Sequence, residues 1–175
     1  MSILVCPLSR VPELARAHAP SHVVSLLDPG TPFPALEGYN DERHLRLPIH
    51  DIEVETIGFD ALCNRRMRAI LDFVGAWRAE APILIHCYAG ISRSTATAYI
   101  TACAQNPHCD EEEIALALRA ASPSASPNRR FVSLADAELG RSGRMVRAIE
   151  KIGRGATWFD IGEAQPFALQ SRFSA

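Results

Sequence analysis

One short segment of the chain combines a thiol, a glycine and an arginine at spacings that suit chemistry on an anion. Residues 86–94 read His-Cys-Tyr-Ala-Gly-Ile-Ser-Arg-Ser, between an apolar strand-like run and a helical run. Loop amides and the N-terminus of a helix attract an anion, and the guanidinium of Arg93 can hold two of its oxygens at once. The same field would stabilise a thiolate at Cys87. The segment therefore predicts a phosphate-like anion site with a nucleophile beside it.

The residues around the Cys-x5-Arg pair make this pattern more specific. A cysteine and an arginine at this spacing can occur by chance in a chain rich in arginine. Gly90 would allow a backbone angle that other residues resist. A purely structural interpretation, with a buried Cys87 and a surface Arg93, leaves Gly90 and Ser94 without a role. We therefore expect a phosphate-binding loop whose amides belong to Tyr88, Ala89, Gly90, Ile91, Ser92 and Arg93.

Residues 86–94 resemble the His-Cys-x5-Arg-Ser/Thr signature loop of cysteine-dependent protein tyrosine phosphatases, and the wider pattern resembles the dual-specificity branch. Residues 22–27 are similar to an early core strand of that family. Residues 47–51 are similar to the strand and loop that carry the general acid, and residues 126–128 to the Ser-Pro-Asn segment that supports the signature loop. The resemblance spans about residues 3–139 and fades beyond them.

The resemblance implies catalytic or supporting roles for several residues of this chain. Cys87 would attack phosphorus and form a phosphocysteine intermediate, while Arg93 would bind the phosphoryl oxygens. Ser94 would hydrogen-bond the thiolate and help it to leave, although a hydroxyl at a helix start is an ordinary feature by itself. His86 and Asn128 would support the loop through hydrogen bonds.

Asp51 is the predicted general acid and base, because the leaving oxygen needs a proton and the attacking water must later lose one. It follows the strand-like run 43–49 and precedes Cys87, as the resemblance requires. The alternative is a solvated loop carboxylate. The rival carboxylates are Glu53, Glu55 and Asp60. The chain lacks the Trp-Pro-Asp triplet of the larger tyrosine-specific enzymes, and His50 stands directly before Asp51 instead.

Strand-like and helix-like segments alternate along the chain. The expected strands cover residues 3–8, 22–27, 43–49 and 83–87, and the expected helices cover 12–18, 59–77, 92–105, 110–120, 129–139 and 143–152. This alternation predicts an α/β fold with a central, mostly parallel twisted sheet flanked by helices on both faces. A ligand would bind at the carboxyl ends of the strands. The length suits a single phosphatase domain over residues 1–175, with residues 154–175 as a tail of no predicted structure.

The composition argues against several classes of partner. The net charge is −2 and shows no basic excess, which disfavours nucleic acid and anionic membranes. No apolar run approaches the length of a membrane span, and the N-terminus lacks the pattern of a signal peptide. Five cysteines without CxxC spacing indicate reduced thiols and a cytoplasmic location. Of 18 basic residues only Lys151 is a lysine, which suggests a GC-rich bacterial genome.

The leading hypothesis is a metal-independent phosphomonoester hydrolase that acts on a phosphorylated protein or a small aryl phosphate. The six histidines show no metal-ligand spacing, so neither a metal nor another cofactor is expected. A thiol-dependent sulfurtransferase or arsenate reductase, and a phosphate-binding module without turnover, are the alternatives. The loop lacks the lysines of phosphoinositide-directed relatives, which disfavours inositol lipids. Tyr88, with Tyr39 or Phe33, would wall a shallow substrate cleft. The sequence makes no prediction of oligomeric state.

Overall fold

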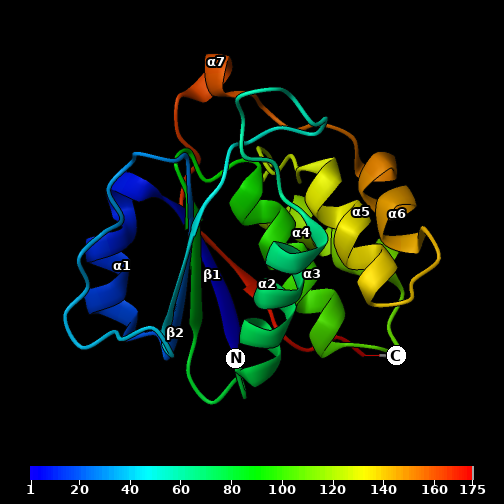
Figure 1. The fold of residues 1–175 in the computed structure, drawn as a ribbon. Coiled ribbons are helices and arrows are strands. Elements are labelled where there is room, and N and C mark those ends of the chain that lie inside the picture. The colour runs from blue at the N-terminus through cyan, green and yellow to red at the C-terminus, as the bar shows by residue number, and fades with distance from the viewer. Residues whose placement is uncertain (175) are drawn as a thin grey trace.

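A computed structural model describes residues 1–174 and contains a five-stranded sheet with helices on both faces (Figure 1). The strands are β1 (Ser2–Pro7), β2 (His22–Leu27), β3 (His44–Pro48), β4 (Ile83–Cys87) and β5 (Phe167–Gln170). Their order in the sheet is β3-β2-β4-β1-β5, and only β5 runs antiparallel to its neighbour. The structure thus confirms the mostly parallel sheet.

The helices divide unequally between the two faces of the sheet. They are α1 (Val11–His18), α2 (Asn64–Ala76), α3 (Arg93–Gln105), α4 (Glu111–Ala121), α5 (Arg129–Glu138), α6 (Arg144–Ile152) and α7 (Trp158–Ile161), with a 3-10 turn, η1, at Leu8–Arg10. Figure 1 shows α1 on one side of the sheet and α2 to α6 on the other. Among the helices of residues 1–174, none has the length and apolarity needed to cross a membrane.

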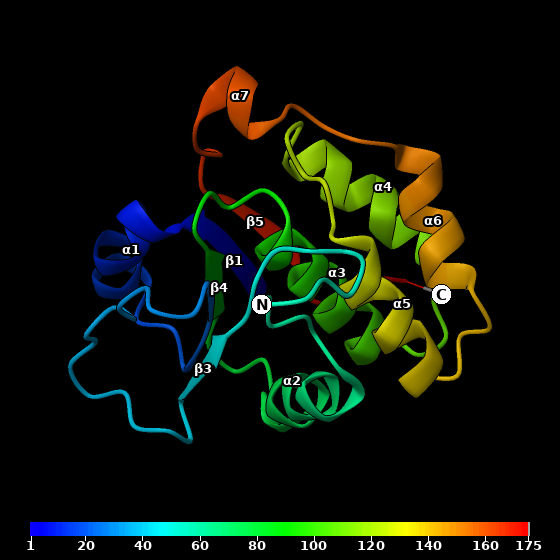
Figure 2. The same ribbon diagram turned by 45° about the horizontal axis from the view of Figure 1, so that its top comes forward.

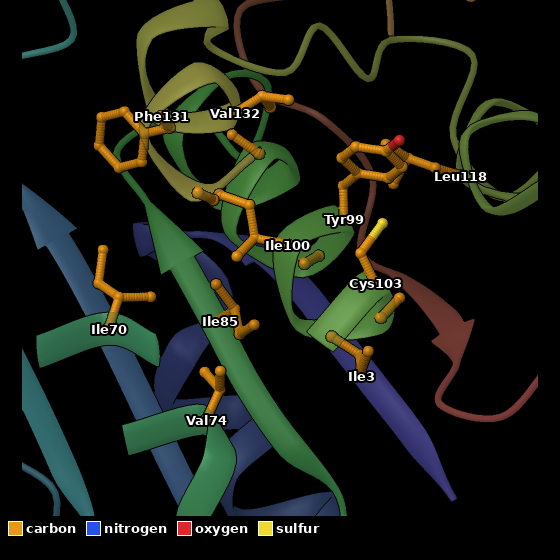
Figure 3. Close-up of a cluster of buried hydrophobic side chains, with 14 of the residues drawn as sticks. Ile3, Ile70, Val74, Ile85, Tyr99, Ile100, Cys103, Leu118, Phe131 and Val132 are labelled. Atoms are coloured by element: carbon orange, nitrogen blue, oxygen red, sulfur yellow. The ribbon is translucent and has the colours of Figure 1, made fainter. Parts of the chain in front are cut away.

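Helix α3 is buried on every side and lies in the centre of the larger helical layer. All of residues 93–103 are buried. Alanine, serine and threonine dominate this helix, so neighbouring elements can approach it closely. The hydroxyls of Thr97 and Thr101 donate to carbonyls one turn earlier, at 2.9 and 2.7 Å, which satisfies these buried groups. Ile85 of β4, Ile100 of α3 and Phe131 of α5 belong to the cluster shown in Figure 3. This packing fixes the start of α3, where Arg93 lies.

The strand order gathers the carboxyl ends of four parallel strands at one edge of the sheet. Strand β4 lies between β1 and β2, with Pro7 opposite Cys87 and Ser25 opposite His86. Strand β3 lies beyond β2, with Pro48 opposite Leu27. The loops that follow β2, β3 and β4 therefore leave the sheet side by side, at the position where open α/β sheets bind their ligands.

Two segments differ from the sequence prediction. The helix expected over residues 59–77 begins only at Asn64. Phe59 lies in the preceding loop, half exposed and packed edge-on against the ring of His50, so its helical spacing did not reflect helical structure. The tail, for which no structure was predicted, contains α7 and β5. Strand β5 has four residues and pairs only with β1, which leaves too short a pattern to recognise.

Candidate active site

The signature loop, residues 86–94, holds the Cys87 thiol at its centre. Cys87 ends β4 and is 2 % exposed. Its Sγ lies 3.1 Å from Oγ of Ser94 and accepts a hydrogen bond from the amide of Gly90 at 3.3 Å. Both groups can donate to sulfur, and both contacts are stronger when the sulfur is negatively charged. The geometry therefore suits a thiolate.

Gly90 lets the signature loop pass against the end of β1. Its φ is +75°, in the left-handed region, and a Cβ at this position would lie 2.9 Å from the backbone nitrogen of Pro7. The neighbouring carbonyl of Tyr88 accepts a hydrogen bond from the amide of Leu8 at 3.0 Å. A side chain at residue 90 would both strain the backbone and open this contact. The loop's path therefore requires the glycine.

The signature loop has most of its carbonyls hydrogen-bonded and, among the described residues, most of its amides without a backbone acceptor. The carbonyl of Ile91 accepts from the amide of Ser126 at 2.9 Å, and that of Ala89 accepts from the amide of Ala164 at 2.9 Å. Within residues 1–174, the amides of Tyr88, Ala89, Ile91 and Ser92 have no backbone acceptor. A loop with bonded carbonyls and free amides at the start of a helix is arranged to receive an anion.

Arg93 is the first residue of α3, and its side chain is only 4 % exposed. Its Nη1 donates to the carbonyl of Ile49 at 2.6 Å and to Oδ1 of Asp28 at 3.0 Å. Its Nε is buried and has no hydrogen-bond partner within residues 1–174. A buried guanidinium N–H without an acceptor is costly. The side chain is thus fixed at one nitrogen and left with unmet donor capacity at another.

Asp28 was not predicted from the sequence as a site residue. It follows directly after β2 and lines the same cleft as Cys87. Its carboxylate pairs with Arg93, so it orients the guanidinium and balances its buried charge. The only signal in the sequence was its position, since it is an acidic residue immediately after a buried strand. Its position indicates a site residue only when the strand order is known, because β2 lies beside β4, the strand that ends at Cys87.

Asp51 is held over the signature loop through one of its two oxygens. Its Oδ1 accepts from Oγ of Ser92 at 2.7 Å and from Nδ2 of Asn128 at 2.8 Å. Its Oδ2 lies 3.8 Å from Nε of Arg93. Asn128 also accepts at Oδ1 from the amide of Phe131, at 3.2 Å, as the N-cap of α5. The side chain of Asn128 therefore positions Asp51, whereas its predicted contact with the signature loop is made by its backbone amide, 3.5 Å from the carbonyl of Ser92.

Among the described residues, none of the three rival carboxylates is hydrogen-bonded to the signature loop. Glu53 lines the cleft, but its Oε1 accepts from the amide of Arg129 at 3.2 Å. Glu55 is exposed and pairs with Arg130 at 2.7 Å. Asp60 does not line the cleft, and its amide donates to the ring of His50. Of the four candidates, Asp51 is the one in contact with both Ser92 and Arg93.

A buried chain of hydrogen bonds supports the loop from beneath. Nε2 of His86 lies 2.6 Å from Oγ of Ser25, which lies 2.7 Å from Nε2 of His44. Nδ1 of His86 lies 3.3 Å from the carbonyl of Cys87. If Nδ1 donates to that carbonyl, Ser25 must donate to His86 and His44 to Ser25. Burial lowers the pKa of each histidine to about 4, so both are neutral at neutral pH.

The cleft above the loop has a volume of about 630 Å³, a size typical of small-molecule sites. Tyr88 lines it, as predicted, but Phe33 and Tyr39 do not. The hydroxyl of Tyr39 donates to the carbonyl of Pro20, and its ring packs against the cluster under α1. That part of the prediction is wrong, because the Pro-rich loop folds towards α1. The second aromatic of the cleft is Trp158, from the tail, which the sequence analysis did not identify.

The remaining cysteines lie in other surroundings. Cys6 lies on β1 next to β4, and burial together with the neighbouring Cys87 raises its pKa to about 12. Burial also raises the pKa of Cys103 to about 12. Within residues 1–174, no group of three or more His, Cys, Asp or Glu side chains is placed to hold a metal ion.

Comparison with solved structures gives the fold a name. No protein-family model and no curated protein matches the sequence. The structure is similar to that of DUSP15, with 22% identity, a TM-score of 0.58, and coverage of 84% of this chain and 89% of that chain. It is also similar to a human tyrosine phosphatase-like serine/threonine/tyrosine-interacting protein, with 20% identity, a TM-score of 0.59, and coverage of 79% of this chain and 91% of that chain. A third similar structure is that of PTPMT1, with 17% identity, a TM-score of 0.52, and coverage of 85% of this chain and 95% of that chain. The chain thus has the fold of dual-specificity and tyrosine phosphatases.

The two buried histidines predict an acid-sensitive fold. The unfolded chain binds protons below the ordinary histidine pKa of 6.5, whereas the folded chain resists them until about pH 4. The free energy of unfolding should therefore fall as the pH drops from 6.5 towards 4. Urea unfolding at about pH 7 and about pH 4.5 measures this loss. His44→Gln should make the loss smaller, because one titrating group is gone. An equal loss in the variant would show that folding does not lower the pKa of His44.

Proposed function

We propose that the chain is a metal-independent phosphomonoester hydrolase of the cysteine-dependent tyrosine phosphatase superfamily, similar to the dual-specificity branch. Its substrate would be a phosphorylated protein or a small aryl phosphate. The observation that carries this proposal is the buried guanidinium of Arg93, which is fixed at Nη1 and has no hydrogen-bond partner at Nε within residues 1–174. Arg93 is the first residue of α3, the helix that directly follows the Cys87 loop. The phosphatase fold supports the proposal independently.

In the first step, Sγ of Cys87 would attack phosphorus while the bond to the ester oxygen breaks. The free amides of the loop and Arg93 would bind the phosphoryl oxygens, where charge stabilisation contributes most to the rate. Asp51 would give its proton to the leaving oxygen, and Oδ2 is the oxygen that has no bonds to Ser92 or Asn128. The products of this step are the free alcohol or phenol and a phosphocysteine.

In the second step, water would attack the phosphocysteine and the S–P bond would break. Asp51, now a carboxylate, would accept the proton of the water. The hydroxyl of Ser94, 3.1 Å from Sγ, would donate a hydrogen bond to the departing thiolate. Phosphate would leave the loop, and the enzyme would return to its starting state with a protonated Asp51 and a thiolate at Cys87.

The position of Asp51 favours this proposal over sulfur transfer and over phosphate binding without turnover. Sulfur transfer and simple phosphate binding need no proton donor above the anion, whereas ester hydrolysis does. One of the fold neighbours is named a phosphatase-like interacting protein, so turnover has to be measured directly. The assay is hydrolysis of an aryl phosphate by the purified chain in the presence of a chelator, with thiosulfate and arsenate tested as alternative substrates.

Cys87→Ser should reduce hydrolysis to the background rate and yet retain tungstate binding. A serine hydroxyl is a far weaker nucleophile than a thiolate at neutral pH, while the amides and Arg93 remain in place. Cys63→Ser is the matched control, since Cys63 is exposed and does not line the cleft. Initial rates and tungstate titration by calorimetry provide the two readouts. Undiminished turnover by Cys87→Ser would rule out the phosphocysteine route.

Asp51→Asn should slow substrates with poor leaving groups far more than those with good ones. We expect a loss of about 10² to 10⁴ in kcat/KM for alkyl phosphates and much less for nitrophenyl phosphate, whose leaving group needs no proton. The measurement is a plot of log kcat/KM against leaving-group basicity for a series of phosphates. Asp60→Asn is the control and should follow the wild-type line. If Glu53→Gln steepens the plot and Asp51→Asn does not, Glu53 is the acid.

A further inference from the structure

The segment between α6 and β5 contributes four residues to the lining of the cleft and is hydrogen-bonded at both ends. We call residues 153–166 the C-terminal strap; Figure 2 shows it passing from α6 through α7 to β5. At its start, the carbonyl of Gly153 accepts from Nη2 of Arg119 at 2.7 Å. Near its end, the amide of Ala164 donates to the carbonyl of Ala89 at 2.9 Å, and Glu163 accepts from Ser9 at 2.6 Å. One end of the strap is therefore bonded directly to the signature loop.

The start of the strap packs tightly on the segment that supports the signature loop. The amide of Gly155 donates to Oγ of Ser126 at 2.9 Å, and the amide of Ser126 donates to the carbonyl of Ile91. A Cβ at residue 155 would lie 2.4 Å from the carbonyl oxygen of Pro123, so no side chain fits there. Hydrogen bonds therefore connect both ends of the strap to the signature loop, one end directly and the other through Ser126.

The strap places one aromatic side chain in the cleft. Trp158 is the first residue of α7, whose start is capped by Thr157 and Asp160 through hydrogen bonds of 2.7 and 2.8 Å. The indole lies 5.9 Å from the ring of Tyr88, centroid to centroid, at an interplanar angle of 54°. Both rings line the cleft and are about half exposed. The next residue, Phe159, is 96 % exposed and does not line the cleft.

We propose that Trp158 is a specificity-determining residue, which forms with Tyr88 an aromatic wall for the group esterified to phosphate. The wall favours a flat aromatic ester group over an alkyl chain, because stacked rings gain energy beyond the burial of their area. The hydrogen bond between the strap and the signature loop ties the two halves of this wall to each other. This proposal rests on the proposed function, phosphate-ester hydrolysis. It adds that the strap, through Trp158, determines which ester groups the site prefers.

Selectivity between matched esters tests the role of Trp158. Trp158→Ala should lower kcat/KM for naphthyl phosphate about tenfold, mainly through KM, and leave butyl phosphate within about twofold. Trp158→Phe should retain most of the aryl preference, because a ring remains. Phe159→Ala is the matched control and should behave as the wild type. Inhibition by tungstate should be the same in all four proteins, since the anion site is untouched.

Tryptophan fluorescence gives a second readout that does not depend on turnover. The chain has two tryptophans, and Trp77 is buried at 1 % exposure. In the Cys87→Ser background, naphthyl phosphate should change the emission of Trp158, and inorganic phosphate should change it much less. Adding Trp158→Phe should abolish the naphthyl-dependent change and leave only the emission of Trp77.

The outcomes separate the two proposals. Loss of aryl preference in Trp158→Ala, together with the naphthyl-dependent emission change, supports the wall. An unchanged ratio of aryl to alkyl kcat/KM in an active Trp158→Ala overturns the wall and leaves phosphatase function standing. A wild-type chain that neither hydrolyses either ester nor binds tungstate overturns the proposed function, and the wall falls with it.

Discussion

The arrangement of the site depends on the burial of one positive charge. A guanidinium enclosed by protein is tolerated only when its donors meet acceptors. Within residues 1–174, Arg93 makes hydrogen bonds at Nη1, while its buried Nε makes none. The two acceptors come from the ends of β2 and β3, and the guanidinium itself comes from the start of α3. The remaining donor capacity points to an anion as the missing partner. Cys87 lies in the loop where that anion would bind.

The fold supplies this constraint through strand order and helix burial. Insertion of β4 between β1 and β2 places Asp28, Ile49 and Cys87 at one edge, although they are far apart in the sequence. Burial of α3 on every side prevents Arg93 from shifting along its axis. Asn128 and Ser92 then hold one oxygen of Asp51 above the loop. Arg93 and Asp51 are thus held in place by elements whose positions the packed core determines.

The sequence predicted the elements with strong periodicity and the residues within one contiguous motif. The four parallel strands and most of the helices after them were confirmed, because short continuous apolar runs and the helical spacing of apolar residues leave clear patterns. Asp28, Trp158 and the short strand β5 were missed, because their roles arise only from contacts between distant segments. Tyr88 lines the cleft as predicted, but the second aromatic of the cleft was expected in the wrong loop for the same reason. Tyr39 packs towards α1, and the tail supplies Trp158 instead. The helix predicted over residues 59–77 was too long at its N-terminal end, because Leu62 is buried although it lies in the loop before α2.

The most direct test of the central claim is to trap phosphate on the nucleophile. In Asp51→Asn, the first step with nitrophenyl phosphate needs no acid, but the second step lacks its base, so the intermediate should accumulate. Rapid quenching after a single turnover, followed by mass spectrometry of the peptides, should find one phosphoryl group on Cys87. A full burst of nitrophenol with no phosphoryl group on Cys87, or with the group on another residue, would contradict the account.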